Sequence, residues 1–202
     1  MMGNTHLAMG IAAALAAMAP DTYSGCLTAV IGGAVGGVLA DIDILDNDNQ
    51  GEGVGVHFMA VAITVLALAI DYFFRLGVCD YFIGCDKDLL IRALGVFIGL
   101  CVFGVLSGHR KFTHSIIAMA AFTFTVKAIY QPLALPFLAG YASHIALDLL
   151  NKRKIRLLYP LKWGVCFDLC YAGKTANKVL MIIGCAGTIT LLGSSVVSIL
   201  LG

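Results

Sequence analysis

The chain has 202 residues, of which 60% are hydrophobic and only 12% are charged. Soluble globular domains are about 45–50% apolar and about 25% charged, so this composition excludes an ordinary soluble domain and points to a lipid bilayer around the chain. The formal net charge of +1 also argues against a protein that binds nucleic acid, because such a protein carries a clear basic excess.

Apolar runs near the length that crosses a bilayer, about 20 residues, predict seven helices in a single integral-membrane domain over residues 1–202. The first two runs are short and rich in alanine and glycine, so either could be a half-buried or tilted helix, and six is the alternative count. The predicted fold class is therefore an all-α polytopic transmembrane helical bundle of six or seven helices. The predicted helices cover residues 6–19, 24–40, 55–75, 89–107, 114–131, 133–150 and 178–201.

Four glycines of the second predicted helix are spaced as overlapping small-xxx-small pairs. They are Gly32, Gly33, Gly36 and Gly37. This spacing lets helix backbones approach closely in lipid, so we expect this helix to pack tightly against its neighbours.

Seven passages divide the loops between two membrane faces. The N-terminus and the loops 41–54, 108–113 and 151–177 share one face, and the loops at 20–23, 76–88 and 132 lie on the other. The first face carries most of the basic side chains, which predicts a multi-pass inner-membrane protein with this face in the cytoplasm. The first face has Arg110, Lys111, Lys152, Arg153, Lys154, Arg156, Lys162, Lys174 and Lys178, and the second has Arg75, Lys87, Arg92 and Lys127.

The densest basic run extends from Asn151 to Arg156, directly after a predicted helix. We interpret it as an anchor that fixes the topology. Binding of anionic lipid headgroups or of nucleic acid is the alternative interpretation.

The seven cysteines leave their redox state open. Cys79 and Cys85 fall in a loop predicted to face an oxidising periplasm, where a small disulfide is one option. Cys166 and Cys170 on the other face could be thiolate ligands. Neutral thiols that pack as small apolar side chains are the alternative for all seven.

Every histidine and three aspartates fall at the ends of predicted helices on the cytoplasmic face. Ionisable groups at the edge of membrane spans are costly, so they are candidate functional residues. Their gathering on one face predicts a metal site there. The candidate ligands are His6, Asp41, Asp43, His57, His109, His114, His144 and Asp148.

The sharpest local pattern is His144 and Asp148, four residues apart in a predicted helix. Positions i and i+4 lie on one face, about 6 Å apart along the axis, so an imidazole and a carboxylate could bind one ion. A hydrogen bond between the two that ties down the helix end is the alternative.

His109 and His114 are five residues apart, a spacing that would separate them by about 140° on a continuous helix. Both can face one site only if the helix breaks between them. Gly108, with Thr113 as the N-cap of the next helix, predicts this break.

Asp41 and Asp43 flank a single residue at the end of the second predicted helix. Two carboxylates this close repel each other unless a metal or an arginine neutralises them, and we favour metal binding. His57 opens the third predicted helix, where a histidine that packs in a helix interface is the alternative to a ligand.

Mixed imidazole and carboxylate ligands suit Zn²⁺, with Mn²⁺ and Fe²⁺ as alternatives. The candidates exceed the ligands of one tetrahedral ion, so one or two ions are predicted; a pair about 3.5–4 Å apart would activate water and hold a phosphate ester in line. Arg110 and Lys111 are predicted to bind the phosphate. Asp43, His109 and Arg110 are predicted to act in catalysis.

Several motifs together are similar to those of a known family. They are Thr5-His6 and the segments 37–43, 109–115, 140–148 and 159–163. On these motifs the sequence resembles the YdjM-type family, described as LexA-regulated inner-membrane proteins that are proposed to be metal-dependent hydrolases. The resemblance covers residues 3–163 as a metal-site core, which leaves residues 164–202 as a C-terminal loop and an additional transmembrane helix. It implies metal-site roles for His6, Asp41, Asp43, His109, His114, His144 and Asp148.

The sequence departs from this family at Ala40, where members often place a proline before Asp-Ile-Asp. Loss of that proline relaxes a helix stop and removes no ligand. More distantly, an early histidine, an aspartate at a helix end and a later His-x3-acid helix are similar to the zinc-dependent phospholipase C and P1 nuclease fold. This likeness implies a phosphate ester as the substrate.

These features predict a membrane-embedded metal-dependent hydrolase, an enzyme that cleaves a phosphate ester with metal-activated water. A membrane lipid is then both the environment and the most economical substrate. The alternative is a non-enzymatic, metal-stabilised membrane scaffold or a regulator that binds a cytoplasmic partner. A homo-oligomer is compatible with either function.

Overall fold

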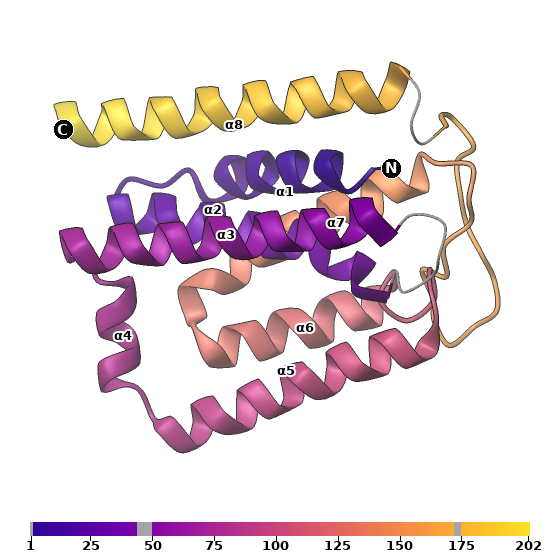
Figure 1. Cartoon of the computed structure of the whole chain (residues 1–202), viewed down its shortest axis with the longest axis horizontal. Helices are drawn as coiled ribbons and strands as arrows, with labels where there is room; N and C mark the ends of the chain where they lie inside the picture. The colour runs from indigo at the N-terminus through magenta and orange to yellow at the C-terminus, as the bar shows by residue number, and fades with distance from the viewer. Residues whose placement is uncertain (1, 44–49, 172–174) are drawn as a thin grey trace.

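The part of the chain that the structure describes folds entirely into helices and loops, without a strand, as the composition predicts. The structure is a computed structural model that describes residues 2–43, 50–171 and 175–202, with the backbone alone described for residues 50–53. Figure 1 shows the long helices lying side by side along one direction. They are α1 (Gly3–Met18), α2 (Tyr23–Leu39), α3 (Gln50–Phe74), α4 (Val78–Gly84), α5 (Lys87–Ser107), α6 (Ile116–Ile129), α7 (Ala134–Leu149) and α8 (Thr175–Leu201), with the 3-10 helices η1 (Ala40–Asp43) and η2 (Gln131–Leu133).

Each predicted helix is present, but the described residues contain one α-helix more than the upper predicted count of seven. The additional helix is α4, which lies in the predicted loop 76–88. Asp71 on α3 accepts hydrogen bonds from the backbone N–H groups of Val78 at 2.9 Å and Cys79 at 2.6 Å. These bonds satisfy amide groups of the first turn of α4, which have no partner inside the helix. A seven-residue helix is too short to show as a long apolar run.

Within the described residues, four helical segments, rather than the predicted seven, are long and apolar enough to cross a membrane. They are Tyr23–Asp43, Val54–Phe74, Lys87–Ser107 and Thr175–Leu201. The helices α1, α6 and α7 have 16, 14 and 16 residues and are shorter than a full span. In Figure 1 the connections after α1, α3, α4 and α6 lie at one end of the bundle, and the loop after α5 lies at the opposite end.

The centre of the bundle is formed by α1, α2 and α7, which approach one another through glycines. A Cβ atom on Gly36 would lie 2.3 Å from the carbonyl oxygen of Phe137 on α7. A Cβ atom on Gly37 would lie 2.6 Å from the carbonyl oxygen of His6 on α1, and one on Gly140 would lie 2.7 Å from that of Gly33. The close approach predicted from the glycine spacing is therefore confirmed.

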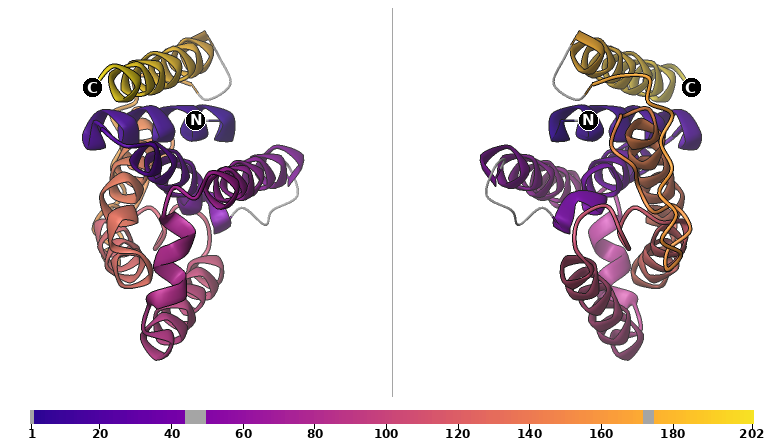
Figure 2. Two further views of the ribbon diagram at one scale, coloured as in Figure 1. Left: turned by 90° about the vertical axis from the view of Figure 1, so that its left-hand side faces the viewer. Right: turned by 90° about the vertical axis from the view of Figure 1, so that its right-hand side faces the viewer.

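The outer helices surround this centre unevenly. Viewed end on in Figure 2, α2 lies in the middle, α3 projects to one side, and α8 lies beyond α1. The buried side chain of Asn177 on α8 accepts hydrogen bonds from the backbone N–H of Met2 and from the hydroxyl of Thr5, both at 3.0 Å. These bonds tie the start of α8 to the start of α1.

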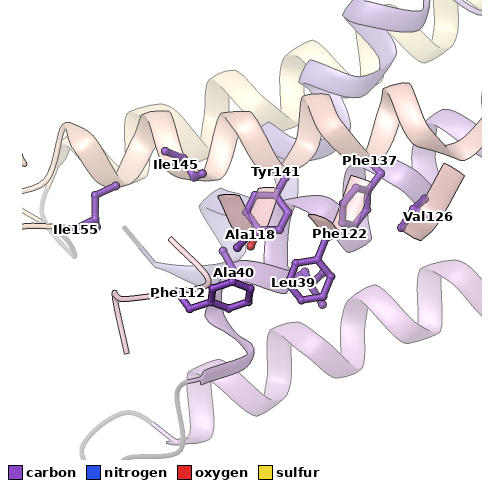
Figure 3. Packing of buried hydrophobic residues seen from close by; sticks show 10 residues of the cluster. All are labelled: Leu39, Ala40, Phe112, Ala118, Phe122, Val126, Phe137, Tyr141, Ile145 and Ile155. Atoms are coloured by element: carbon purple, nitrogen blue, oxygen red, sulfur yellow. The ribbon is translucent and has the colours of Figure 1, made fainter. Parts of the chain in front are cut away.

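A buried apolar cluster lies between α2, α6, α7 and two loops, and Figure 3 shows its packing. Phe112 and Ile155 extend into this cluster from the loops that follow α5 and α7. The hydroxyl of Tyr141 on α7 donates a hydrogen bond to the carbonyl oxygen of Thr113. The loop between α5 and α6 is therefore held against α7, close to the predicted ligands.

All seven cysteines are free thiols. Cys79 and Cys85 are therefore not joined by the disulfide that the sequence left as an option. Lys174, counted among the basic residues of the cytoplasmic face, and residues 44–49 of the predicted loop 41–54 lie outside the described residues.

Replacing Gly36 with alanine is expected to destabilise the protein, because the added methyl group would force α2 and α7 apart. Overpacking of this kind costs about 1–3 kcal/mol. The measurement is the midpoint of thermal unfolding in detergent, followed by the circular dichroism of the helices. Gly99→Ala on α5 is the matched control, because nothing lies within 4 Å of its Cβ position. Equal loss of stability in both variants would contradict the close contact.

Candidate metal centre

Four segments that are distant in sequence meet at one end of the bundle, and each contributes ionisable side chains. They are the start of α1, the 3-10 helix η1, the loop 108–115 and the end of α7. Figure 1 shows the start of α1 and the end of α7 at the same end of the bundle. The structure thus brings predicted site residues from all four segments together.

Asp41, His114, His144 and Asp148 form one group, which we call the buried cluster, and it could hold a metal ion. His114 Nε2 lies 3.5 Å from Asp41 Oδ1 and 3.3 Å from Asp148 Oδ2. His144 Nε2 lies 3.6 Å from Asp41 Oδ1, 4.0 Å from Asp148 Oδ2 and 3.4 Å from His114 Nε2. The side chain of Asp41 is the most exposed of the four, at 13%, and that of Asp148 is 1% exposed.

Hydrogen bonds on the outer side of both imidazoles fix which nitrogen faces the cluster. His144 Nδ1 lies 2.8 Å from the carbonyl oxygen of Gly37, which can only accept, so Nδ1 carries the proton. The Thr113 hydroxyl donates to Asp43 at 2.7 Å, and its oxygen must therefore accept from His114 Nδ1 at 3.1 Å. In the neutral imidazoles, both Nε2 atoms then point a lone pair into the cluster, as they do in histidine ligands of metals.

The distances within the buried cluster fit a tetrahedral ion. Two bare Nε2 atoms and two carboxylates that face one another repel unless a cation lies between them. An ion with bonds of about 2.0–2.1 Å keeps its ligand atoms about 3.3–3.4 Å apart. Four of the five measured distances lie between 3.3 and 3.6 Å.

The charges of the region also favour a cation. The region contains the carboxylates of Asp41, Asp43 and Asp148, and the guanidinium of Arg110 pairs with Asp148. With the histidines neutral, the other two carboxylates carry two negative charges that a divalent ion could balance. Burial acts to lower the pKa of His114, in the loop between α5 and α6, but hydrogen bonds and charges of Asp148 and Asp41 outweigh it and raise this pKa to about 9. The cluster therefore attracts positive charge, whether a proton or a metal ion.

His6 on α1 packs against the buried cluster. Its ring stacks on that of His144, with the centroids 3.8 Å apart and an angle of 18° between the planes. His6 Nε2 lies 3.3 Å from Asp148 Oδ1, yet neither ring nitrogen makes a well-oriented hydrogen bond with a described residue. A buried imidazole in this state is costly in free energy, and a nearby cation would account for it.

Asp43 and His109 belong to a second group that includes His114. His109 Nδ1 donates a hydrogen bond to Asp43 Oδ1 at 2.8 Å, which is the length of a hydrogen bond rather than of two ligands on one ion. The carboxylate of Asp43 is buried, whereas 35% of the His109 side chain is exposed. We call these two residues the Asp43–His109 pair, and its exposed imidazole is placed to exchange protons.

Arg110 connects the pair with the buried cluster. Its Nη2 lies 3.4 Å from Asp148 Oδ2, and its Nε donates to His109 Nε2 at 3.3 Å. The backbone of Arg110 is left-handed, with a φ of 62°, which is uncommon for a residue other than glycine. Such strain persists where the surroundings fix it, often at functional sites. Lys111 lies beside Gly108 and belongs to neither group.

One local prediction differs from the structure. Thr113 is not the N-cap of α6, because Ser115 caps this helix and accepts a hydrogen bond from the N–H of Ala118 at 3.1 Å. Asp41 and Asp43 fall in different groups of candidate ligands, and both groups include His114. His57 lies on α3, in neither group.

Sequence reasoning missed the two residues that orient the histidines, Thr113 and Gly37. A threonine directly before a predicted ligand histidine is a signal that could have identified Thr113. Gly37 orients His144 through its backbone carbonyl oxygen. Every residue type has this group, so the sequence contains no signal for the contact.

Comparison with known proteins identifies one family. The sequence model described as YdjM inner membrane protein matches residues 1–201. No curated protein and no solved structure matches the chain.

Removing one ligand of the buried cluster is expected to abolish metal binding. His144→Ala and Asp41→Ala each remove one of four converging ligand atoms, and we expect both purified proteins to lose the transition metal that the wild type contains. The measurement is the metal content in detergent by mass spectrometry. His57→Gln is the control and should retain the metal. A wild-type protein without stoichiometric transition metal would contradict the metal centre.

Thr113→Val is expected to weaken metal binding without removing a ligand, because His114 Nδ1 loses the hydroxyl oxygen that accepts its hydrogen bond. Loss of such an outer partner typically lowers metal affinity about 10–100-fold. Titration against a competing chelator measures this affinity. Thr113→Ser keeps the hydroxyl and should bind as the wild type does; identical affinity in all three proteins would overturn the assigned role of Thr113.

Proposed function

This chain belongs to the YdjM inner membrane protein family, and from that family and its buried cluster we propose that it is a membrane-embedded metal-dependent hydrolase that cleaves a phosphate ester of a lipid. The observation that carries the proposal is the pair of Nε2 atoms of His114 and His144. They are held 3.4 Å apart among carboxylates, beside an exposed imidazole and an arginine.

The proposed cofactor is Zn²⁺, with Mn²⁺ and Fe²⁺ as alternatives, because two imidazoles and two carboxylates suit these ions. Asp41, His114, His144 and Asp148 would hold it. When bound, such an ion polarises a phosphoryl oxygen and lowers the pKa of water, so that water becomes a nucleophile near neutral pH. A second ion at Asp43 and His109 would have to replace the hydrogen bond between them, so we propose one ion and one proton-transfer pair.

The Asp43–His109 pair is proposed to move the proton. Because Nδ1 of His109 donates to the buried carboxylate, Nε2 is the nitrogen that can accept a proton from water or deliver one to the leaving alcohol. Asp43 holds the imidazole in this tautomer and stabilises its protonated form. In the reaction the oxygen of water bonds to phosphorus, the ester P–O bond breaks, and the alcohol leaves with a proton.

Arg110 is proposed to bind the phosphate. A guanidinium can donate two parallel hydrogen bonds to phosphate oxygens. Its present partners are a carboxylate oxygen of Asp148, the Nε2 of His109 and a backbone carbonyl oxygen, so a phosphate between the cluster and the pair would compete for the same donors. Lys111, one residue later, is proposed to add a second positive charge.

A lipid is the proposed substrate because of the location of the site. The four apolar candidate spans support a location in a membrane, and the site lies at one end of the bundle. The excess of basic residues at this end favours the cytoplasmic side. A phosphorylated lipid headgroup would meet the site there without leaving the bilayer.

The competing function is a metal-stabilised scaffold without catalysis. The burial of the ligands favours it, because His114 and His144 have no exposed side-chain area and an ion would tie three separate segments together. Four protein ligands are typical of structural zinc sites, whereas catalytic sites keep one position open. The contacts of Asp148 with Arg110 and His6 argue for the enzyme. A carboxylate that has these other partners can leave the metal ion and open a coordination position for water or substrate.

His109→Gln separates the two functions. We expect it to keep its metal and its thermal stability, because His109 is not in the buried cluster, and to lose at least about 100-fold in turnover, the usual contribution of a proton-transfer group. The assay is release of water-soluble headgroups from radiolabelled phospholipids in mixed micelles. Metal-loaded wild-type protein without turnover on any phospholipid would support the scaffold instead.

A further inference from the structure

The segment from Asn151 to Tyr171, between α7 and α8, forms an ordered platform beside the site. Ile155 is fully buried in the apolar core and exchanges two backbone hydrogen bonds with Val165, at 3.0 and 2.9 Å. The N–H groups of Phe167 and Leu169 bond to the carbonyl oxygens at the end of α7. Figure 2 shows the segment running along the α6 and α7 side of the bundle.

The outer surface of this platform is apolar although it lies at the polar end of the bundle. Trp163 is 74% exposed, Leu169 72% and Phe167 60%. Leu158, Leu161 and Tyr171 are exposed beside them. A large exposed apolar surface of this kind marks an interaction site.

Basic side chains are interleaved with these apolar ones. The platform contains Lys152, Arg153, Lys154, Arg156 and Lys162, and its one acidic residue is Asp168. Asp168 pairs with Lys152 at 3.4 Å, and Lys152 also lies 4.3 Å above the ring of Tyr171. The remaining four cations therefore have no carboxylate within the platform.

We infer that this platform docks onto a bilayer surface that contains anionic phospholipid. Long basic side chains reach phosphate headgroups while an indole and aliphatic side chains enter the boundary with the acyl chains. Nucleic acid or an acidic protein would account for the cations and leave Leu158, Leu161, Phe167 and Leu169 without a role. The inference does not depend on hydrolysis, and it holds equally for a scaffold.

The platform is joined to the candidate site through the backbone. Arg110 Nη1 donates to the carbonyl oxygen of Arg153 at 3.0 Å, and the N–H of Arg156 donates to the carbonyl oxygen of Arg110 at 3.1 Å. A headgroup bound by the platform would therefore lie beside Arg110. Lipid composition then controls which headgroups are concentrated beside Arg110.

Trp163 provides the test, because it is the only tryptophan of the chain. The full-length protein is reconstituted in nanodiscs of pure phosphatidylcholine or of an equal mixture with phosphatidylglycerol. We expect the emission of Trp163 to shift to shorter wavelength, and its quenching by iodide to fall, only in the mixture. High salt should reverse both changes.

Matched variants identify the cations. The triple variant Arg153→Gln, Lys154→Gln, Lys162→Gln is expected to bind phosphatidylglycerol about 100-fold more weakly, since each of the three basic residues contributes about fivefold at such a surface. Lys87→Gln, Arg92→Gln and Lys127→Gln, at exposed positions of the opposite end, form the control and should behave as the wild type. Energy transfer from Trp163 to headgroup-labelled phosphatidylglycerol measures the binding, and circular dichroism verifies that all proteins are folded.

Three outcomes would overturn the inference. The first is equal exposure of Trp163 to iodide in both lipid compositions. The second is protection in pure phosphatidylcholine that salt and the triple variant leave unchanged. The third is protection that requires added nucleic acid or an acidic protein instead of phosphatidylglycerol.

Discussion

Contact between the backbones of α1, α2 and α7 is the constraint on which the rest of the structure depends. Gly37 contributes to this contact in two ways. It has no side chain, so the carbonyl oxygen of His6 can lie close to it, and its own carbonyl oxygen accepts a hydrogen bond from His144. Any larger residue would clash with the backbone of His6 and force the helices to move apart. The packing of small residues, common in membrane proteins, thus sets the positions of the ligands.

The orientation of the hydrogen bonds then decides the chemistry of the cluster. Gly37 accepts a hydrogen bond from Nδ1 of His144, and Thr113 accepts one from Nδ1 of His114. In the neutral imidazoles the Nε2 atoms therefore carry no proton and lie among carboxylates. Burying such groups without a counter-charge costs several kcal/mol per charge. A protein that is only 12% charged gathers these groups at one point, and the energetic cost of that arrangement is lowest when a cation is present.

The sequence predicted the helices and the general position of the site, because apolar runs and the end of each run follow from residue type alone. It could not predict α4, whose formation depends on a carboxylate of α3 rather than on its own apolar pattern. The separation of Asp41 from Asp43 depends on η1, and the role of Thr113 depends on a hydroxyl that bridges two side chains. Such contacts arise only after the helices have packed.

The contrast between the two groups of ionisable residues bears most on function. A purely structural ion needs only the buried cluster, which would be complete with four ligands. Nothing in that role requires His109, whose Nδ1 donates to the buried carboxylate of Asp43 and whose Nε2 accepts a hydrogen bond from Arg110. Nor does it require Arg110 in a left-handed conformation between the two groups. The proposed acid-base pair and the proposed phosphate-binding arginine lie beside a group that could hold a cation, and this shared location is the physical argument for the proposed catalysis.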